Sequence, residues 1–177
     1  AGGQEFLRSV WDEITENADQ HNDPGQFTAF SGYEWTSVEF NLHRVVVFEG
    51  DAAQTRALLP FSKFDSDTPE DLWDHLARYE RETGSDVLAI PHNGNLSQGH
   101  MFMLEDSKGQ PLSKTYAEAR SRWEPLYEVT QIKGDSETHP MLSPNDEFAD
   151  FETWHSWSGW SLNGLDMDDL KDRKKYE

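Results

Sequence analysis

The chain has 177 residues, a length that is enough for one domain with a core. It has no cysteine, and this excludes disulfides, zinc–thiolate sites and cysteine nucleophiles. Its formal net charge is -19, from 34 acidic and 15 basic residues, and this negative field argues against nucleic-acid partners. A phosphorylated small substrate stays compatible with that charge, because bound metal ions can invert the field locally.

The first twenty or so residues carry no targeting signal. They are acidic and amphipathic, whereas a signal peptide needs a basic start followed by an apolar stretch. No run of about 18 apolar residues occurs in the chain, so we expect a soluble protein without a membrane span and without a membrane partner. A signal upstream of residue 1 is compatible with this sequence, and the cellular compartment is left open.

A helix over 4–20 and two strands, over 27–33 and 45–48, are the first elements predicted. The apolar residues of the first segment recur at the spacing of one helix face: Phe6, Leu7, Val10, Trp11, Ile14 and Ala18. The run NDPG at 22–25 is a turn signal that separates this helix from the first strand.

The next predicted elements are a helix from Pro69 to about Glu82 and an apolar strand over 87–91. Thr68 suits the helix N-cap, proline is favoured at the first helical position, and Gly84 marks the end. The later part of the chain is predicted as a polar loop over 93–113, a helix over 116–123, a strand over 126–132, a loop over 133–144 and helices over 145–154 and 166–175. The alternation of helices and strands indicates an α/β fold with parallel neighbouring strands.

Several polar residues fall where strands end. Glu34 and His92 stand at the carboxyl ends of two predicted strands, and Glu128 and Asp135 lie within and just past a third. Sites in parallel α/β folds are built at such ends. His43 instead precedes its strand, and an antiparallel return from Glu34 would bring it back beside that carboxylate. Imidazole and carboxylate ligands suit zinc, manganese or iron.

Structural explanations compete with this interpretation. A lone histidine on a strand is more often structural than a ligand, and Glu34 has a possible ion-pair partner in Arg44. The run Asn93, Gly94 and Asn95 after His92 also fits a simple turn. The polar loop that contains Lys133, Asp135 and His139 also fits a solvated surface loop. The residue spacing alone leaves these alternatives open.

Five segments resemble a known family: GYEWTS, NLHRVVVF, IPHNGNLSQGHMF, RWEPLYEVTQIKGDSETHP and LSPNDEFADFETW. They are similar to domain of unknown function 3604, a bacterial family related to the polymerase-and-histidinol-phosphatase (PHP) phosphoesterases. The resemblance implies a TIM-barrel-like, distorted (β/α) barrel with two or three metals at its carboxyl face. It also implies metal ligands at three positions: Glu34, in the bridging role, His43 and His92. Asn93 replaces the proline that usually follows the last of these.

Other PHP motifs are missing. The sequence contains no His-x-His motif, and no Asp-x-His follows Trp154. The resemblance therefore implies that 1–177 is a single domain cut from a larger PHP-like barrel, a partial α/β barrel of about four strands with flanking helices. We expect poor metal affinity and little or no turnover from such a fragment, and exposed strand edges that favour a homo-oligomer.

The function expected from the resemblance is that of a metal-dependent, phosphoesterase-like hydrolase that acts on a small molecule with a divalent metal as cofactor. Its expected catalytic residues are Lys133, Asp135 and Glu128, and its expected substrate-binding residues are Asn93, Asn95 and His139. The alternative is a non-catalytic binding or structural module that retains a PHP-like fold. The identity of the substrate stays open.

Overall fold

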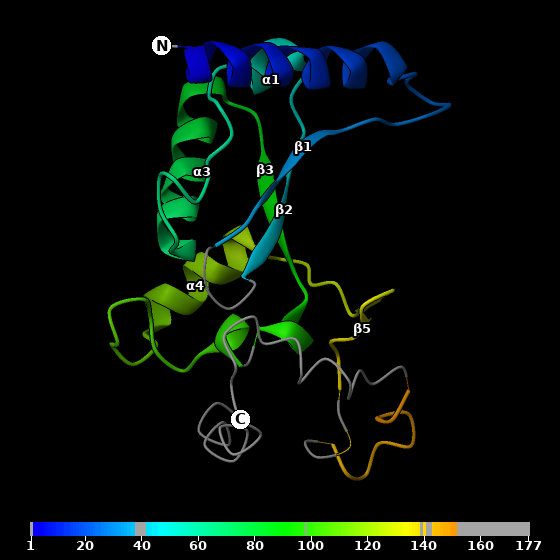
Figure 1. Cartoon of the computed structure of the whole chain (residues 1–177), viewed down its shortest axis with the longest axis vertical. Coiled ribbons are helices and arrows are strands. Elements are labelled where there is room, and N and C mark those ends of the chain that lie inside the picture. Colours follow the sequence, from blue (N-terminus) through cyan, green and yellow to red (C-terminus); the bar gives the residue numbers. More distant parts are fainter. Residues whose placement is uncertain (1, 38–41, 98, 139, 141–142, 152–177) are drawn as a thin grey trace.

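The computed structural model describes residues 2–37, 42–97, 99–138, 140 and 143–151 (Figure 1). Its elements in chain order are α1 (Gly2–His21), β1 (Ser31–Trp35), β2 (His43–Phe48), α2 (Ala52–Thr55), α3 (Pro69–Thr83), β3 (Val87–His92), the 3-10 turns η1 (Gly94–Leu96) and η2 (His100–Phe102), α4 (Lys114–Trp123), β4 (Thr130–Gln131) and β5 (Gly134–Asp135). The described part is thus a mixed α/β structure. None of its helices combines the length and the apolar character needed to cross a membrane.

The central sheet is antiparallel, with the order β1-β2-β3. The predicted antiparallel return from Glu34 to His43 is confirmed, whereas our prediction of parallel neighbours is wrong for β2 and β3. The short connection from Trp35 to His43 can only return antiparallel, because a parallel crossover needs a dozen or more residues. The connection from β2 to β3 is long enough for a parallel crossover. It instead runs along the length of the sheet and back again, so that β3 is antiparallel to β2.

Two hydrogen bonds mark these traverses. The backbone nitrogen of Glu49, just after β2, donates to the Asp86 carbonyl just before β3 (3.0 Å), so both lie at one end of the sheet. The indole nitrogen of Trp35 donates to the Ser66 carbonyl at the other end (3.3 Å). The irregular segment before α3 therefore runs the length of the sheet, and α3 runs back. Strand β3 consequently starts where β2 ended.

Strand alternation gives the sheet one buried and one open face. The buried face packs against α1 and α3, which Figure 1 shows across one end of the sheet and along its side. The resulting core consists of Trp11, Trp35, Val46, Phe48, Leu72, Leu76, Tyr79, Val87 and Ala89. Each large side chain buried in this way contributes roughly 1.5–3 kcal/mol to stability. On the open face, Val45 remains 38% exposed.

Helices α1 and α3 agree with the predictions, whereas the short helix α2 was not predicted. Helix α1 was predicted over 4–20 and covers Gly2–His21. In α3 the Thr68 side chain accepts a hydrogen bond from the backbone nitrogen of Asp71, and Gly84 ends the helix in the left-handed conformation, at φ 71°. Strand β1 begins later than predicted, because Phe27 closes a turn with Asp23 and is not yet part of the sheet.

The predictions for the later chain are less accurate. The strand predicted over 126–132 is reduced to the short hairpin β4–β5, preceded by one backbone hydrogen bond from Glu128 to the Pro91 carbonyl (3.2 Å). Its apolar residues Leu126, Val129 and Ile132 are 56%, 46% and 91% exposed, so burial does not hold them in a strand. Residues 143–151 form turns rather than the predicted helix, and 152–154 and the helix predicted at 166–175 lie outside the described residues. No closed barrel is present among the described strands.

Candidate metal centre

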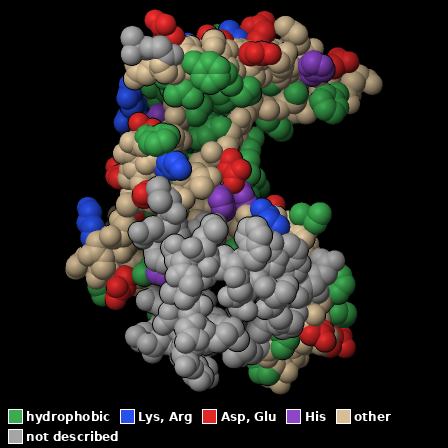
Figure 2. Space-filling model, in the orientation of Figure 1, with side chains coloured by type: hydrophobic (Ala, Val, Ile, Leu, Met, Phe, Trp, Pro, Cys, Tyr) green, Lys and Arg blue, Asp and Glu red, His purple; other side chains and the backbone are tan. Residues whose placement is uncertain are grey.

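Three potential metal ligands converge at one end of the central sheet. Glu34 Oε1 lies 3.0 Å from His43 Nδ1 and 3.2 Å from His92 Nε2. One ligand atom from each of these residues lies within 4.8 Å of the others. Figure 2 shows histidine side chains at the surface in the middle of the view, between an acidic and a basic side chain. We call Glu34, His43 and His92 the three-ligand cluster.

The antiparallel register explains this convergence. His43 of β2 pairs with His92 of β3. Glu34 of β1 pairs with Val45, which lies two residues after His43 on β2 and therefore on the same face of the sheet. Because side chains alternate between the faces of a sheet, the three ligands share the open face. The neighbouring residues at this end, Trp35, Arg44 and Pro91, point to the opposite face and are fully buried. The two imidazole rings stack with centroids 5.4 Å apart.

The geometry of the three-ligand cluster fits a divalent metal. Ligand atoms about 2.0–2.2 Å from a tetrahedral ion stand about 3.3 Å apart, close to the observed distances from Glu34 Oε1 to the two histidines. Two imidazoles and one carboxylate leave a fourth position open for water or substrate, as in catalytic sites. The side chain of Glu34 is half-exposed, at 50%, so the cluster is open to solvent on one side.

The surroundings of the two histidines differ. Thr36 Oγ1 lies 3.0 Å from His43 Nδ1, the same ring nitrogen that faces Glu34. The Nδ1 atom of His92 is buried and has no hydrogen-bond partner among the described residues. Burial lowers the pKa of His43 below its ordinary value; Glu34 opposes this shift, and the electrostatic influence of the neighbouring His92 and Lys133 adds to it. His43 therefore stays neutral at neutral pH, which is the form that binds metal.

This pKa shift predicts the pH dependence of metal binding. Protons compete with metal for His43 as the pH approaches its pKa, and that pKa lies below the ordinary 6.5. We expect Zn²⁺ affinity to be nearly constant between about pH 8 and about pH 7 and to fall as the pH drops below about 6.5. Competition titrations against a chromophoric chelator across this range would check it. An affinity that already declines between about pH 8 and pH 7 would contradict the lowered pKa.

Lys133 and Asp135 lie in the β4–β5 hairpin, which is fastened to the turn that follows His92. The side-chain nitrogen of Asn95 donates to the Lys133 carbonyl (2.9 Å), and the Ser136 hydroxyl donates to Asn95 Oδ1 (2.9 Å). Lys133 is close enough to His43 for its charge to affect that pKa. The carboxylate of Asp135 accepts a hydrogen bond from the backbone nitrogen of Glu137 (3.0 Å).

The structure leaves the remaining predicted residues outside the three-ligand cluster. Glu128 is half-buried, and its carboxylate accepts a hydrogen bond from Gln131. Asn93 is buried at 1% exposure in the left-handed conformation, at φ 61°, and its side-chain oxygen has no partner among the described residues. His139 lies outside the described residues.

A close contact between Gly94 and Tyr127 supports the turn after His92. A β-carbon at Gly94 would overlap the Tyr127 hydroxyl, so no larger residue fits without a shift. We expect Gly94→Ala to destabilise the protein by about 1–3 kcal/mol through this overlap, measured by urea unfolding. Adding Tyr127→Phe removes the overlapping oxygen and should recover part of the loss. A Gly94→Ala protein as stable as the wild type would show that the turn and Tyr127 separate easily.

Sequence reasoning missed a buried ion pair behind the three-ligand cluster. Arg44, which we had considered as a partner for Glu34, points to the other face of the sheet, and its Nε donates to Glu124 Oε1 (3.0 Å). Trp73 donates to the same oxygen (2.9 Å), and Arg120 Nε lies 3.3 Å from Glu124 Oε2. The alternation of β2 could have revealed the direction of Arg44, but nothing in the sequence identifies a partner 80 residues away.

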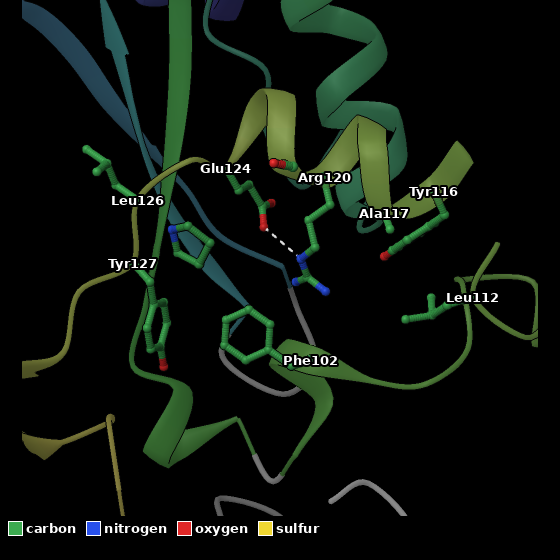
Figure 3. Close-up of a pocket in the computed structure, with 10 residues that line it drawn as sticks. Phe102, Leu112, Tyr116, Ala117, Arg120, Glu124, Leu126 and Tyr127 are labelled. Carbon is green, nitrogen blue, oxygen red and sulfur yellow. Dashed lines mark hydrogen bonds and ion pairs between the residues drawn. The ribbon is translucent and has the colours of Figure 1, made fainter. Parts of the chain in front are cut away.

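A pocket lies beside this ion pair, and its lining residues are drawn in Figure 3. Phe102, Leu126 and Tyr127 form much of its apolar lining, and the dashed line marks the Arg120–Glu124 contact. Pro91 also lines the pocket, from the face of the sheet opposite to that of His92. The pocket is therefore separate from the three-ligand cluster.

Comparison with known proteins gives one family match. Searches of curated proteins and of solved structures gave no significant match. A family described as protein of unknown function (DUF3604) matches residues 2–168, which include every described element and the whole three-ligand cluster. That match covers nearly the entire chain of 177 residues. The chain belongs to the DUF3604 family.

Proposed function

We propose that this chain carries the metal centre of a divalent-metal-dependent hydrolase that acts on a phosphoester. The observation that carries the proposal is the convergence of Glu34, His43 and His92 from three strands, with Glu34 Oε1 at 3.0 and 3.2 Å from the two histidines. A relationship to the PHP phosphoesterases, and a larger barrel around the described sheet, are part of the same proposal. All three ligands at one end of the sheet would suit such a barrel.

Each residue has a role in this proposal. When bound, a divalent metal polarises a phosphoryl oxygen and supplies a water molecule of lowered pKa. His43 and His92 would hold the ion through their imidazole nitrogens, and Glu34 would contribute a carboxylate oxygen from the half-exposed side. Lys133 offsets negative charge on the phosphoryl group. Asp135 and Glu128 are held outside the cluster and have weaker support as catalytic groups.

The activity can be tested with p-nitrophenyl phosphate, a generic phosphomonoester. We expect the chain to release nitrophenol slowly, only with added Mn²⁺ or Zn²⁺, and to stop when a chelator is added. His92→Ala should abolish the metal-dependent part of the rate, because the ion is no longer held. His75→Ala, which changes a histidine on α3 away from the cluster, serves as the control. Equal metal-dependent rates in the wild type and His92→Ala would contradict the assignment.

A non-catalytic metal-binding module is the second candidate. It is favoured by the small number of ligands, since the described residues supply only three at this site. Two-metal phosphoesterases need more protein ligands to hold both ions in fixed geometry. A chain that binds metal tightly through His92 but releases no nitrophenol above the metal-only background would favour this module over the hydrolase.

A further inference from the structure

Asn95 fastens the β4–β5 hairpin to the turn after His92. Its side-chain nitrogen donates to the Lys133 carbonyl (2.9 Å), and its side-chain oxygen accepts from the Ser136 hydroxyl (2.9 Å). The backbone nitrogen of Asn95 also donates to Ser136 Oγ (3.3 Å). Both ends of the Asn95 amide are therefore engaged within the protein, which leaves it poorly suited to direct substrate contact.

Lys133 is the residue whose position these bonds fix. Lys133 lies in the turn between β4 and β5, and the Asn95 side chain donates a hydrogen bond to the Lys133 carbonyl. The Lys133 side chain is half-buried, and its ammonium forms no ion pair with a carboxylate of the described residues. Asn95, which binds the Lys133 carbonyl, follows the ligand His92 by three residues, so the hairpin lies against the turn that leaves the three-ligand cluster. A cation without a carboxylate partner among the described residues therefore lies next to that turn.

The chain as a whole carries a net charge of -19. The overall field disfavours anions, so an anionic group needs local positive charge to approach the cluster. A bound divalent ion supplies part of that charge, and an ammonium beside it supplies a second contact for an oxygen of the anion. A phosphate-type group fits this arrangement, because it offers several oxygens that can bind the metal and the lysine together.

We propose that Asn95 is a positioning residue that holds the β4–β5 hairpin against the turn after His92, so that Lys133 binds a phosphate-type anion at the metal centre. This inference rests on the proposed function for the metal centre itself. It assigns Asn95 an indirect role in place of the direct substrate contact expected from the sequence. It also predicts that substitutions of Asn95 and Lys133 have non-additive effects on anion binding.

The first arm of the test needs no metal. Trypsin cleaves after Lys133 at the very carbonyl that Asn95 binds, so releasing the hairpin should expose that bond. We expect Asn95→Ala to accelerate cleavage after Lys133 several-fold, as followed by mass spectrometry. Cleavage after Lys108, in an exposed turn of the same chain, should not change and provides an internal reference. Asn17→Ala, at an exposed position on α1, is the matched control. Ser136→Ala should also accelerate cleavage after Lys133, because it removes the hydroxyl that donates to Asn95 Oδ1.

The second arm measures binding of inorganic phosphate to the Zn²⁺-loaded chain by calorimetry. We expect Lys133→Met to weaken phosphate binding by roughly tenfold, the loss typical of one charge-assisted contact. Asn95→Ala should weaken it by roughly threefold to tenfold and leave Zn²⁺ affinity unchanged. When Lys133→Met is already present, Asn95→Ala should have no further effect.

The outcomes separate the inference from the function on which it rests. A wild-type chain that binds no Zn²⁺ overturns the proposed function before phosphate is added, and the cleavage arm still decides whether Asn95 holds the hairpin. Zn²⁺ binding with unchanged phosphate affinity and unchanged cleavage in Asn95→Ala overturns the inference alone. An equal loss of phosphate affinity with and without Lys133 also overturns it, because Asn95 would then contact the anion directly.

Discussion

His92→Ala is expected to weaken Zn²⁺ binding by roughly a hundredfold or more, since losing a direct ligand costs at least as much as losing an outer-shell partner. His92 is nearly buried and lies on the same face of the sheet as Glu34 and His43, so no neighbouring water-exposed side chain can replace it easily. Zinc titration with a chromophoric competitor would measure the change.

The control for this prediction is another partly buried histidine. His75 on α3 packs against Phe61, with ring centroids 5.0 Å apart, and belongs to no metal cluster among the described residues. His75→Ala removes the same side chain and should leave Zn²⁺ affinity within about twofold of the wild type. Circular dichroism of both variants would show whether the fold survives. Equal losses of affinity in the two variants would mean that folding, and not ligation, controls binding.

Glu124→Gln is expected to destabilise the protein by about 3–5 kcal/mol, the cost of leaving a buried charge without its partner. The side chains of Arg44 and Glu124 are 0% and 2% exposed, so solvent cannot compensate Arg44 once the carboxylate is neutral. Urea unfolding would measure the loss. The double variant Arg44→Met with Glu124→Leu should recover most of it, because two well-packed apolar side chains can replace a buried ion pair.

The control for this prediction is an exposed ion pair of similar length. Arg78 Nε lies 2.7 Å from Glu82 Oε1 on the surface of α3. Exposed pairs contribute about 0–1 kcal/mol, so Glu82→Gln should change stability by less than that. Losses of similar size from Glu124→Gln and Glu82→Gln would show that burial does not amplify the Arg44–Glu124 interaction.

The approach of Glu34 to His43 was predictable from sequence because it depends on local rules, whereas His92 was expected as a third ligand from the family resemblance. The short connection between Trp35 and His43 forces an antiparallel return, and alternation then puts Glu34 and His43 on one face. Helix α3 was predictable for similar reasons, since Thr68 and Gly84 determine its ends through backbone geometry that neighbouring residues alone specify. These features need no knowledge of distant contacts.

The features that the sequence did not reveal depend on long-range packing. The direction of β3 follows from the path of the irregular segment before α3, which has no periodicity to read. The partner of Arg44 lies 80 residues away, on the end of α4. The strand predicted over 126–132 satisfies the local pattern of a strand, but its exposed Ile132 and Val129 show that no tertiary packing among the described residues supports it.

The most direct test of the metal centre is X-ray absorption spectroscopy of the Zn²⁺-loaded chain. We predict a first shell of nitrogen and oxygen atoms at about 2.0–2.2 Å, with the multiple scattering of two imidazole rings. His43→Ala should reduce that signal to one ring, and Glu34→Gln should keep both rings while it loses a carboxylate oxygen. A wild-type spectrum without imidazole scattering, or one that His43→Ala leaves unchanged, would contradict the three-ligand cluster as the metal site.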